Sequence, residues 1–119
     1  MRNLRLAMAQ INTTVGDLEG NTDKILSFIE KAREHQTDLI TFPEMAVTGY
    51  PPEDLLFHNS FIESNIEKMH DIVAASIGMT VVVGFVSHSQ SIFNSAAIGH
   101  NGKLVTVYNK IFLPNYGVF

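Results

Sequence analysis

Two charged residues, each at the end of an apolar stretch, are the candidates for chemistry in this sequence. Glu44 follows the apolar run LITF and Pro43, and Lys110 follows LVTVYN. A carboxylate at the end of a buried strand, partly removed from water, can act as a general base. A lysine at the same edge of a sheet can offset the charge of a developing oxyanion. Together they predict a base and a cation facing one cleft.

Each residue also has a plainer interpretation, which the local sequence leaves open. Glu44 could cap the turn that follows it or face water, and a single lysine at a strand end is most often a solvated charge. The expected pairing of the two residues is what favours a catalytic interpretation for Lys110. The tyrosines Tyr50, Tyr108 and Tyr116 could line a pocket, although packing is the commoner use of such rings.

Other kinds of site have little support. The chain has no cysteine, which excludes disulfides, thiolate metal sites and a cysteine nucleophile within these 119 residues. The histidines show no HxH, HxxxH or HExxH spacing, so we expect no metal site. Neither GxGxxG nor GxxxxGK[ST] occurs, so no nucleotide-phosphate loop is predicted.

The elements that must position Glu44 form a strand, a helix and a second strand. Residues 4–11 alternate and predict a strand that places Leu4, Leu6 and Met8 on one face. A helix with Asn21 as its N-cap is expected to follow, because apolar residues recur there at i, i+3, i+4 and i+7. These residues are Ile25, Phe28, Ile29 and Ala32. The compact run 38–42 then predicts a buried strand, whose carboxyl end is where open α/β sheets place ligand sites.

The second half of the chain predicts one more helix and three strands. A turn of helix is expected at 53–57, and a longer helix at 60–77 has apolar residues at helical spacing. These are Ile62, Ile66, Met69, Val73 and Ile77. Strands are expected at 79–87, 90–99 and 102–110, and the turn HNG joins the last two as a hairpin. The order β-α-β-α-β-β-β predicts an α/β fold with helices packed on one face of a mixed sheet.

Length and charge narrow the class of protein. The 119 residues fit one domain. Eight Lys and Arg residues, scattered along the chain, stand against twelve Asp and Glu, which argues against nucleic acid or an anionic membrane as a partner. No signal-peptide core and no run of about 20 apolar residues is present, so we expect a cytoplasmic protein. The sequence stops within the aromatic phrase LPNYGVF, and we expect a fragment of a longer chain.

Two phrases carry a resemblance to a known family. FPEMAVTGYPPEDLL and VYNKIFLPNYGVF resemble the glutaminase-domain signatures of the glutamine-dependent NAD synthetases, a branch of the nitrilase (carbon-nitrogen hydrolase) superfamily. The FPE…TGY phrase is shared across the superfamily. The continuations YPPEDLL and KIFLPNYGVF, with the opening AQINTTVGDLEGN, narrow the resemblance to the NAD synthetase branch.

The resemblance implies a Glu-Lys-Cys triad that hydrolyses the side-chain amide of glutamine. Glu44 matches the general base, Lys110 the lysine that steadies the tetrahedral intermediate, and Tyr116 a tyrosine that contacts glutamine. The cysteine would lie beyond Phe119, so the chain alone is expected to be inactive. Residues 1–119 would then be the N-terminal portion of a glutaminase domain, about half of a four-layer α-β-β-α sandwich.

The resemblance also implies partners. The rest of the same chain would complete the sandwich and carry a synthetase domain that uses ATP and Mg²⁺ to amidate deamido-NAD, and the whole enzyme would be a homo-oligomer. No cofactor is expected within the 119 residues themselves. Two alternatives remain: another amidase of the nitrilase superfamily, and a non-catalytic binding or oligomerisation module.

Overall fold

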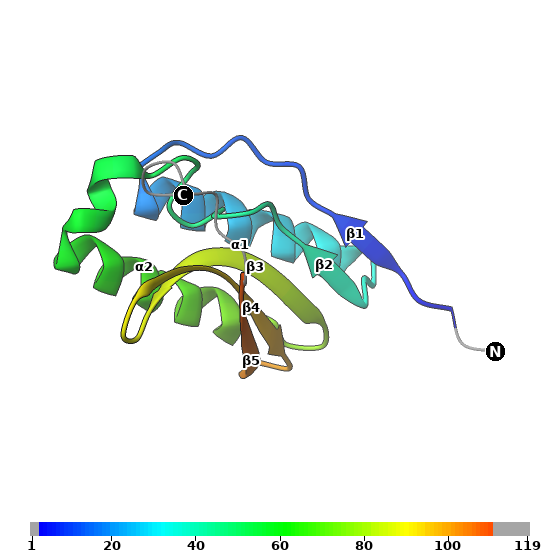
Figure 1. Cartoon of the computed structure of the whole chain (residues 1–119). Helices are drawn as coiled ribbons and strands as arrows, with labels where there is room; N and C mark the ends of the chain where they lie inside the picture. The colour runs from blue at the N-terminus through cyan, green and yellow to red at the C-terminus, as the bar shows by residue number, and fades with distance from the viewer. Residues whose placement is uncertain (1–2, 111–119) are drawn as a thin grey trace.

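Two helices and a five-stranded sheet make up the chain in the computed structural model, which describes residues 3–110 (Figure 1). The elements are β1 (Leu6–Met8), α1 (Leu18–Glu34), β2 (Leu39–Thr41), the 3₁₀ helix η1 (Glu53–Phe57), α2 (Asn59–Ala74), β3 (Thr80–His88), β4 (Ile92–His100) and β5 (Lys103–Asn109). This is the predicted order of helices and strands. The predicted α/β class, with a mixed sheet, is confirmed.

The strands lie in the order in which they occur along the chain. β1, β2 and β3 are parallel, and β4 is antiparallel to both β3 and β5. β5 therefore runs in the same direction as β2 and β3. The carboxyl ends of these three strands lie at one edge of the sheet, which is the edge where Glu44 and Lys110 follow their strands.

One face of the sheet packs against both helices. The helices contribute apolar side chains at helical spacing, and the strands contribute every second residue. The core that they form contains Ile25, Ile29, Ala32, Ile40, Met69, Ile72, Val73, Val81, Val83 and Phe85. The predicted stripe of the first helix is confirmed, with Phe28 partly buried at its margin. This pattern of burial confirms the prediction that the helices pack on one face of the sheet.

The other face of the sheet is open over the part of the chain that the structure describes. Leu4, Leu6 and Met8 do share one face, and their side chains are 69%, 52% and 74% exposed. Their neighbours Ala7 and Ala9 point the other way and pack against the helix-covered core. One half of the predicted four-layer arrangement, a helix layer on a sheet, is therefore present.

The start of α1 differs from the prediction. The N-cap is Asp17, whose Oδ1 accepts the Gly20 N–H at 2.9 Å. Asn21, which the sequence predicts as the cap, lies inside the first turn and is fully buried. Its side chain accepts the Thr14 N–H at 2.8 Å and donates to the Val47 carbonyl at 3.0 Å. The amide is used to hold two loops together, which local sequence does not reveal.

The end of α2 is also earlier than predicted. The helix ends at Ala74, and Ile77, which the periodicity places in the buried stripe, is 56% exposed. Arg33 from α1 donates to the carbonyls of Ala75 and Ile77, which satisfies acceptors beyond the last helical turn. This long-range contact supports the earlier end of the helix and is not visible in the local sequence.

Candidate active site

Glu44 and Lys110 follow β2 and β5, two strands that are not neighbours in the sheet. Two strands, β3 and β4, separate β2 from β5, which puts their backbones about 14 Å apart. The segment that follows β2 closes this gap by crossing over β3 at Gly84. A Cβ atom at that position would lie 2.4 Å from the Met45 nitrogen and 2.6 Å from the Pro43 carbonyl oxygen. Only glycine permits so close a crossing, and the crossing carries Glu44 toward β5.

The backbone just after Glu44, at Met45, is also held in one conformation. Met45 has a φ of 51°, in the left-handed region that a residue with a Cβ rarely adopts. Its side chain is fully buried in a small cluster with Leu56 and Val86. This burial stabilises the unusual conformation, which turns the chain sharply immediately after Glu44.

The carboxylate of Glu44 meets the ammonium of Lys110. The Lys110 Nζ atom lies 3.2 Å from Oε1 of Glu44, and the two side chains are 45% and 47% exposed. Asn94 from β4 donates its side-chain N–H to the same oxygen. The backbone carbonyl of Asn94 also accepts the Lys110 N–H at 2.9 Å. The structure thus brings the two residues that the sequence singled out into one cluster, with Asn94 between them.

This cluster lines a cavity of about 260 Å³. The lining residues come from β3, β4, β5 and the segment after β2: Phe42, Pro43, Glu44, Val82, Gly84, Asn94, Ser95, Ala96, Tyr108 and Lys110. The walls are mostly apolar, and the charged pair forms part of the lining. A cavity of this kind can hold a small polar substrate with a base and a cation against its reacting group.

Two residues that line the cavity, Ser95 and Tyr108, carry a hydroxyl group, and Ser95 can be considered as a nucleophile. Ser95 pairs with Phe85 of β3, so its side chain lies on the helix-covered face of the sheet, opposite to that of Asn94. Ser95 is 4% exposed, and its hydroxyl donates to Oδ1 of Asn109 at 2.6 Å and contacts the Ser87 hydroxyl at 2.7 Å. The hydrogen-bond partners of this hydroxyl are thus Asn109, Phe93 and Ser87, and the Glu44 carboxylate is not among them. Activation of a nucleophile requires a base within hydrogen-bond reach, and Ser95 lacks that arrangement with Glu44.

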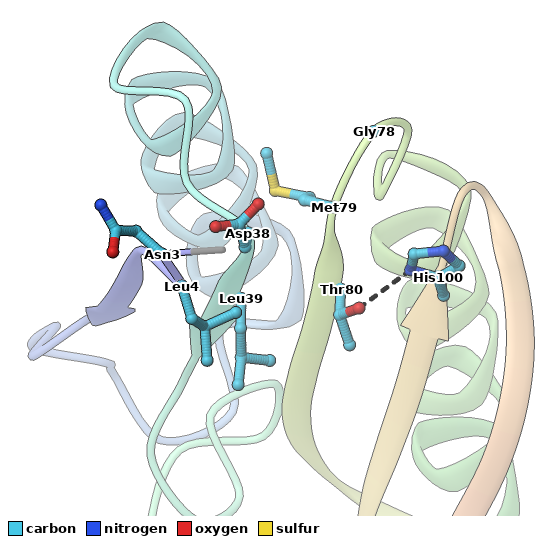
Figure 2. Close-up of a pocket in the computed structure, with 8 residues that line it drawn as sticks. All are labelled: Asn3, Leu4, Asp38, Leu39, Gly78, Met79, Thr80 and His100. Carbon is cyan, nitrogen blue, oxygen red and sulfur yellow. Dashed lines mark hydrogen bonds between the residues drawn. The ribbon is translucent and has the colours of Figure 1, made fainter. Parts of the chain in front are cut away.

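A second cavity of about 380 Å³ lies at the opposite edge of the sheet (Figure 2). Its lining includes Asp38, Thr80 and His100. The Thr80 hydroxyl and the His100 ring lie 2.9 Å apart and bond to each other, and Asp38 accepts the Arg5 N–H at 2.7 Å. These hydrogen bonds hold the ends of neighbouring strands together.

Several residues bear on the sequence predictions without settling them. Tyr116 lies outside the described residues, so its predicted contact with glutamine remains a prediction. Tyr108 lines the cavity together with Lys110, whereas Tyr50 does not.

Among residues 3–110, no group of three or more His, Asp or Glu side chains could hold a metal ion. Neither helix in that range is long and apolar enough to cross a membrane.

Two residues that shape the site, Gly84 and Asn94, were not predicted from the sequence. Gly84 interrupts a run of valines in a strand, and such a glycine often marks a close approach of another backbone. Asn94 stands in the otherwise apolar and small run of β4, where a buried amide needs a hydrogen-bond partner. The glycine and the asparagine are both visible in the sequence. Neither residue by itself indicates that the segment around Glu44 crosses Gly84 or that Glu44 accepts a hydrogen bond from Asn94.

Comparison with known proteins gives one family and one group of close relatives. Residues 5–118 match the carbon-nitrogen hydrolase family. The chain is 40% identical over its whole length to a glutamine-dependent NAD(+) synthetase of Thermotoga maritima, and 42% identical over 98% of its length to that of Xanthomonas campestris. It covers 21% of each protein. The chain thus spans about a fifth of the length of the curated relatives it matches.

Solved structures agree with this match. A glutamine-dependent NAD(+) synthetase from Cytophaga hutchinsonii superposes with a TM-score of 0.90 at 31% identity, over 94% of this chain and 20% of that one. An amidase from Nesterenkonia sp. superposes with a TM-score of 0.82 over 95% of this chain and 44% of its own. The amidase is 18% identical and shows the shared fold alone. These structures confirm the predicted nitrilase-type α/β fold.

Proposed function

This chain belongs to the carbon-nitrogen hydrolase family, and we propose that it forms the first part of the glutaminase domain of a glutamine-dependent NAD synthetase. The observation that carries the proposal is the 3.2 Å contact between Lys110 Nζ and Glu44 Oε1 in the lining of a small cavity. The choice of glutamine as substrate rests on the relatives of that name, which are 40% and 42% identical over nearly all of this chain.

The two charged groups serve complementary steps of amide hydrolysis. A thiol supplied by the rest of the protein loses its proton to the Glu44 carboxylate, and the thiolate attacks the carbonyl carbon of the glutamine side chain. Lys110 offsets the negative charge on the resulting oxyanion. Glu44 returns the proton to the leaving nitrogen, ammonia departs, and water then hydrolyses the thioester to release glutamate.

The remaining parts of the proposal concern the longer protein. The rest of the chain supplies the cysteine and covers the open face of the sheet, and Tyr116 contacts glutamine. A synthetase domain uses the ammonia with ATP and Mg²⁺ to amidate deamido-NAD, in a cytoplasmic homo-oligomer. No residue of this chain is assigned to ATP or Mg²⁺.

The test uses the protein expressed from the whole gene and measures ammonia release from glutamine and from short aliphatic amides. The proposal expects hydrolysis of glutamine, and loss of at least about 100-fold in kcat for Glu44→Gln, because the side chain keeps its shape and loses its basicity. Hydrolysis of aliphatic amides in preference to glutamine would instead favour another amidase of the family. No amide hydrolysis by the unmodified protein would favour a non-catalytic module.

A further inference from the structure

Asn94 contacts both members of the charged pair. Its side chain is 6% exposed, and it donates an N–H to Oε1 of Glu44. Its backbone carbonyl accepts the N–H of Lys110 at 2.9 Å. The side chain of Asn94 thus holds the carboxylate of Glu44, and its backbone holds the backbone of Lys110.

The two donors reach the same carboxylate oxygen. Lys110 Nζ and Asn94 Nδ2 both contact Oε1 of Glu44, and within residues 3–110 no donor contacts Oε2. A carboxylate that is held through one oxygen by two donors from different strands has a restricted rotation about its terminal bond. The second oxygen is then presented in one direction.

We propose that Asn94 is a positioning residue that makes Oε2 of Glu44 the oxygen that exchanges the proton, while Oε1 stays bound to Asn94 and Lys110. In the proposed reaction, the thiol proton passes to Oε2 and leaves from Oε2 to the departing nitrogen. This inference rests on the proposed function. It adds that the base has two unequal oxygens, and that a residue of β4 sets which one reacts.

The competing interpretation is a direct contact between Asn94 and the substrate, because Asn94 also lines the cavity. The two interpretations differ in kinetics. A residue that orients the base acts on the chemical step and lowers kcat, whereas a residue that binds glutamine in the ground state raises KM.

The first experiment measures kcat and KM for glutamine in the protein expressed from the whole gene. Asn94→Leu removes the donor at similar size, and Asn94→Asp keeps the shape and replaces the donor by an acceptor, so that one variant is available if the other fails to fold. We expect kcat to fall about 10- to 100-fold with KM changed less than about twofold. A rise in KM with unchanged kcat overturns the proposal.

The matched control is Ser76→Ala. Ser76 is fully buried, and its hydroxyl donates to the Val73 carbonyl and accepts the Gly102 N–H at 2.9 Å, at the opposite end of β4 from Asn94. This variant loses a buried polar group without touching Glu44. We expect it to lower the melting temperature and leave kcat unchanged. An equal fall of kcat in both variants would make the effect one of stability and would overturn the proposal.

A second experiment tests whether Asn94 acts through Glu44. Asn94→Leu is introduced into the Glu44→Gln protein, and the residual rates are compared. Because a positioning residue has nothing left to position there, we expect less than a twofold further loss, and a full additional 10- to 100-fold loss contradicts the proposal.

A crystal structure of the Asn94→Leu protein supplies a readout that needs no activity. We expect the Glu44 carboxylate to rotate away from its contact with Lys110, and an unmoved carboxylate overturns the proposal. If the unmodified protein fails to release ammonia from glutamine, the proposed function fails, and this structure still decides whether Asn94 holds Glu44.

Discussion

The ammonium of Lys110 lies 3.2 Å from the carboxylate of Glu44, although 66 positions separate the two residues in sequence. Both side chains are about half exposed, and an ion pair in such a setting contributes less than about 1 kcal/mol to folding. The pair is brought together by the close crossing of two backbones at Gly84 and by the left-handed conformation of Met45. Such backbone features are costly in relation to so small a gain in stability. The arrangement is therefore better explained by chemistry than by stability.

Replacing Lys110 tests whether the ion pair matters for activity and not for stability. In the protein expressed from the whole gene, Lys110→Met is expected to lower kcat for glutamine about 100- to 1,000-fold, because the oxyanion loses its cation. The free energy of unfolding should change by less than about 1 kcal/mol. Lys68→Met is the matched control, since Lys68 of α2 pairs with Glu19 of α1 at 3.4 Å. A comparable loss of activity in both variants would contradict the assignment.

Gly84→Ala tests the crossing that carries Glu44. The new methyl group would fall 2.4 Å from the Met45 nitrogen, so backbone and not a flexible side chain must move. We expect a loss of about 1–3 kcal/mol in stability, measured by urea denaturation, and a fall in kcat of at least about 10-fold.

The control for this glycine is Gly99→Ala in β4. There the methyl group would meet the Val73 side chain at 3.0 Å, on the helix-covered face and away from Glu44. Stability should fall and kcat should not. Equal changes of kcat in the two variants would show that the crossing at Gly84 has no special part in placing the base.

Arg33 is expected to stabilise the fold without affecting catalysis. It donates to the Ala75 carbonyl at 2.6 Å and to the Ile77 carbonyl, and its Nε atom lies 3.5 Å from Glu30. Arg33→Ala should lower the free energy of unfolding by about 1–3 kcal/mol through the freed carbonyls. Glu30→Ala removes only the ion pair and should cost less than about 0.5 kcal/mol. Similar losses in both variants would mean that the ion pair, and not the capping of α2, is what matters.

The isolated 119-residue chain is expected to release no ammonia from glutamine. It has no cysteine, and the buried hydroxyl of Ser95, a residue next to Asn94, bonds to Asn109 and not to Glu44. A coupled assay for ammonia on the purified chain measures this directly. Ammonia release that disappears in the Ser95→Ala variant would contradict the need for an external thiol.

The open face of the sheet is expected to be buried by the rest of the chain. Met8 is 74% exposed here, so Met8→Glu should change the stability of the isolated chain by less than about 0.5 kcal/mol. In the protein expressed from the whole gene, the same change should cost several times more, because it would bury an unpaired charge. Thermal denaturation of both proteins, each with its own unmodified reference, makes the comparison. Equal effects in the two would show that this face stays uncovered.

Much of the fold follows from local patterns. Helical spacing around Ile25 and Ile29 and the alternation in residues 4–11 predict the first elements, although β1 is shorter than that stretch and covers Leu6–Met8. The Asn101–Gly102 turn, in which both residues have positive φ, predicts the last hairpin. The candidate base and cation also follow, because each ends an apolar strand.

What the patterns do not contain is the set of contacts between distant residues. Asn21 holds two loops together and does not cap the helix, and Arg33 of α1 donates to a carbonyl just beyond the end of α2. The partnership of Asn94 with Glu44 depends on a crossing over β3 that no short window of sequence can show.

The open face of the sheet also has a consequence for the timing of synthesis. A β-hairpin such as β3–β4 forms in about 1–10 μs, whereas a ribosome adds about 5–20 residues per second. In the proposed longer protein, we therefore expect the β3–β4 hairpin to form before the residues that cover the sheet have been made. For on the order of ten seconds the nascent chain displays Leu6 and Met8 to water, and during that interval it is a substrate for chaperones that hold unfinished chains.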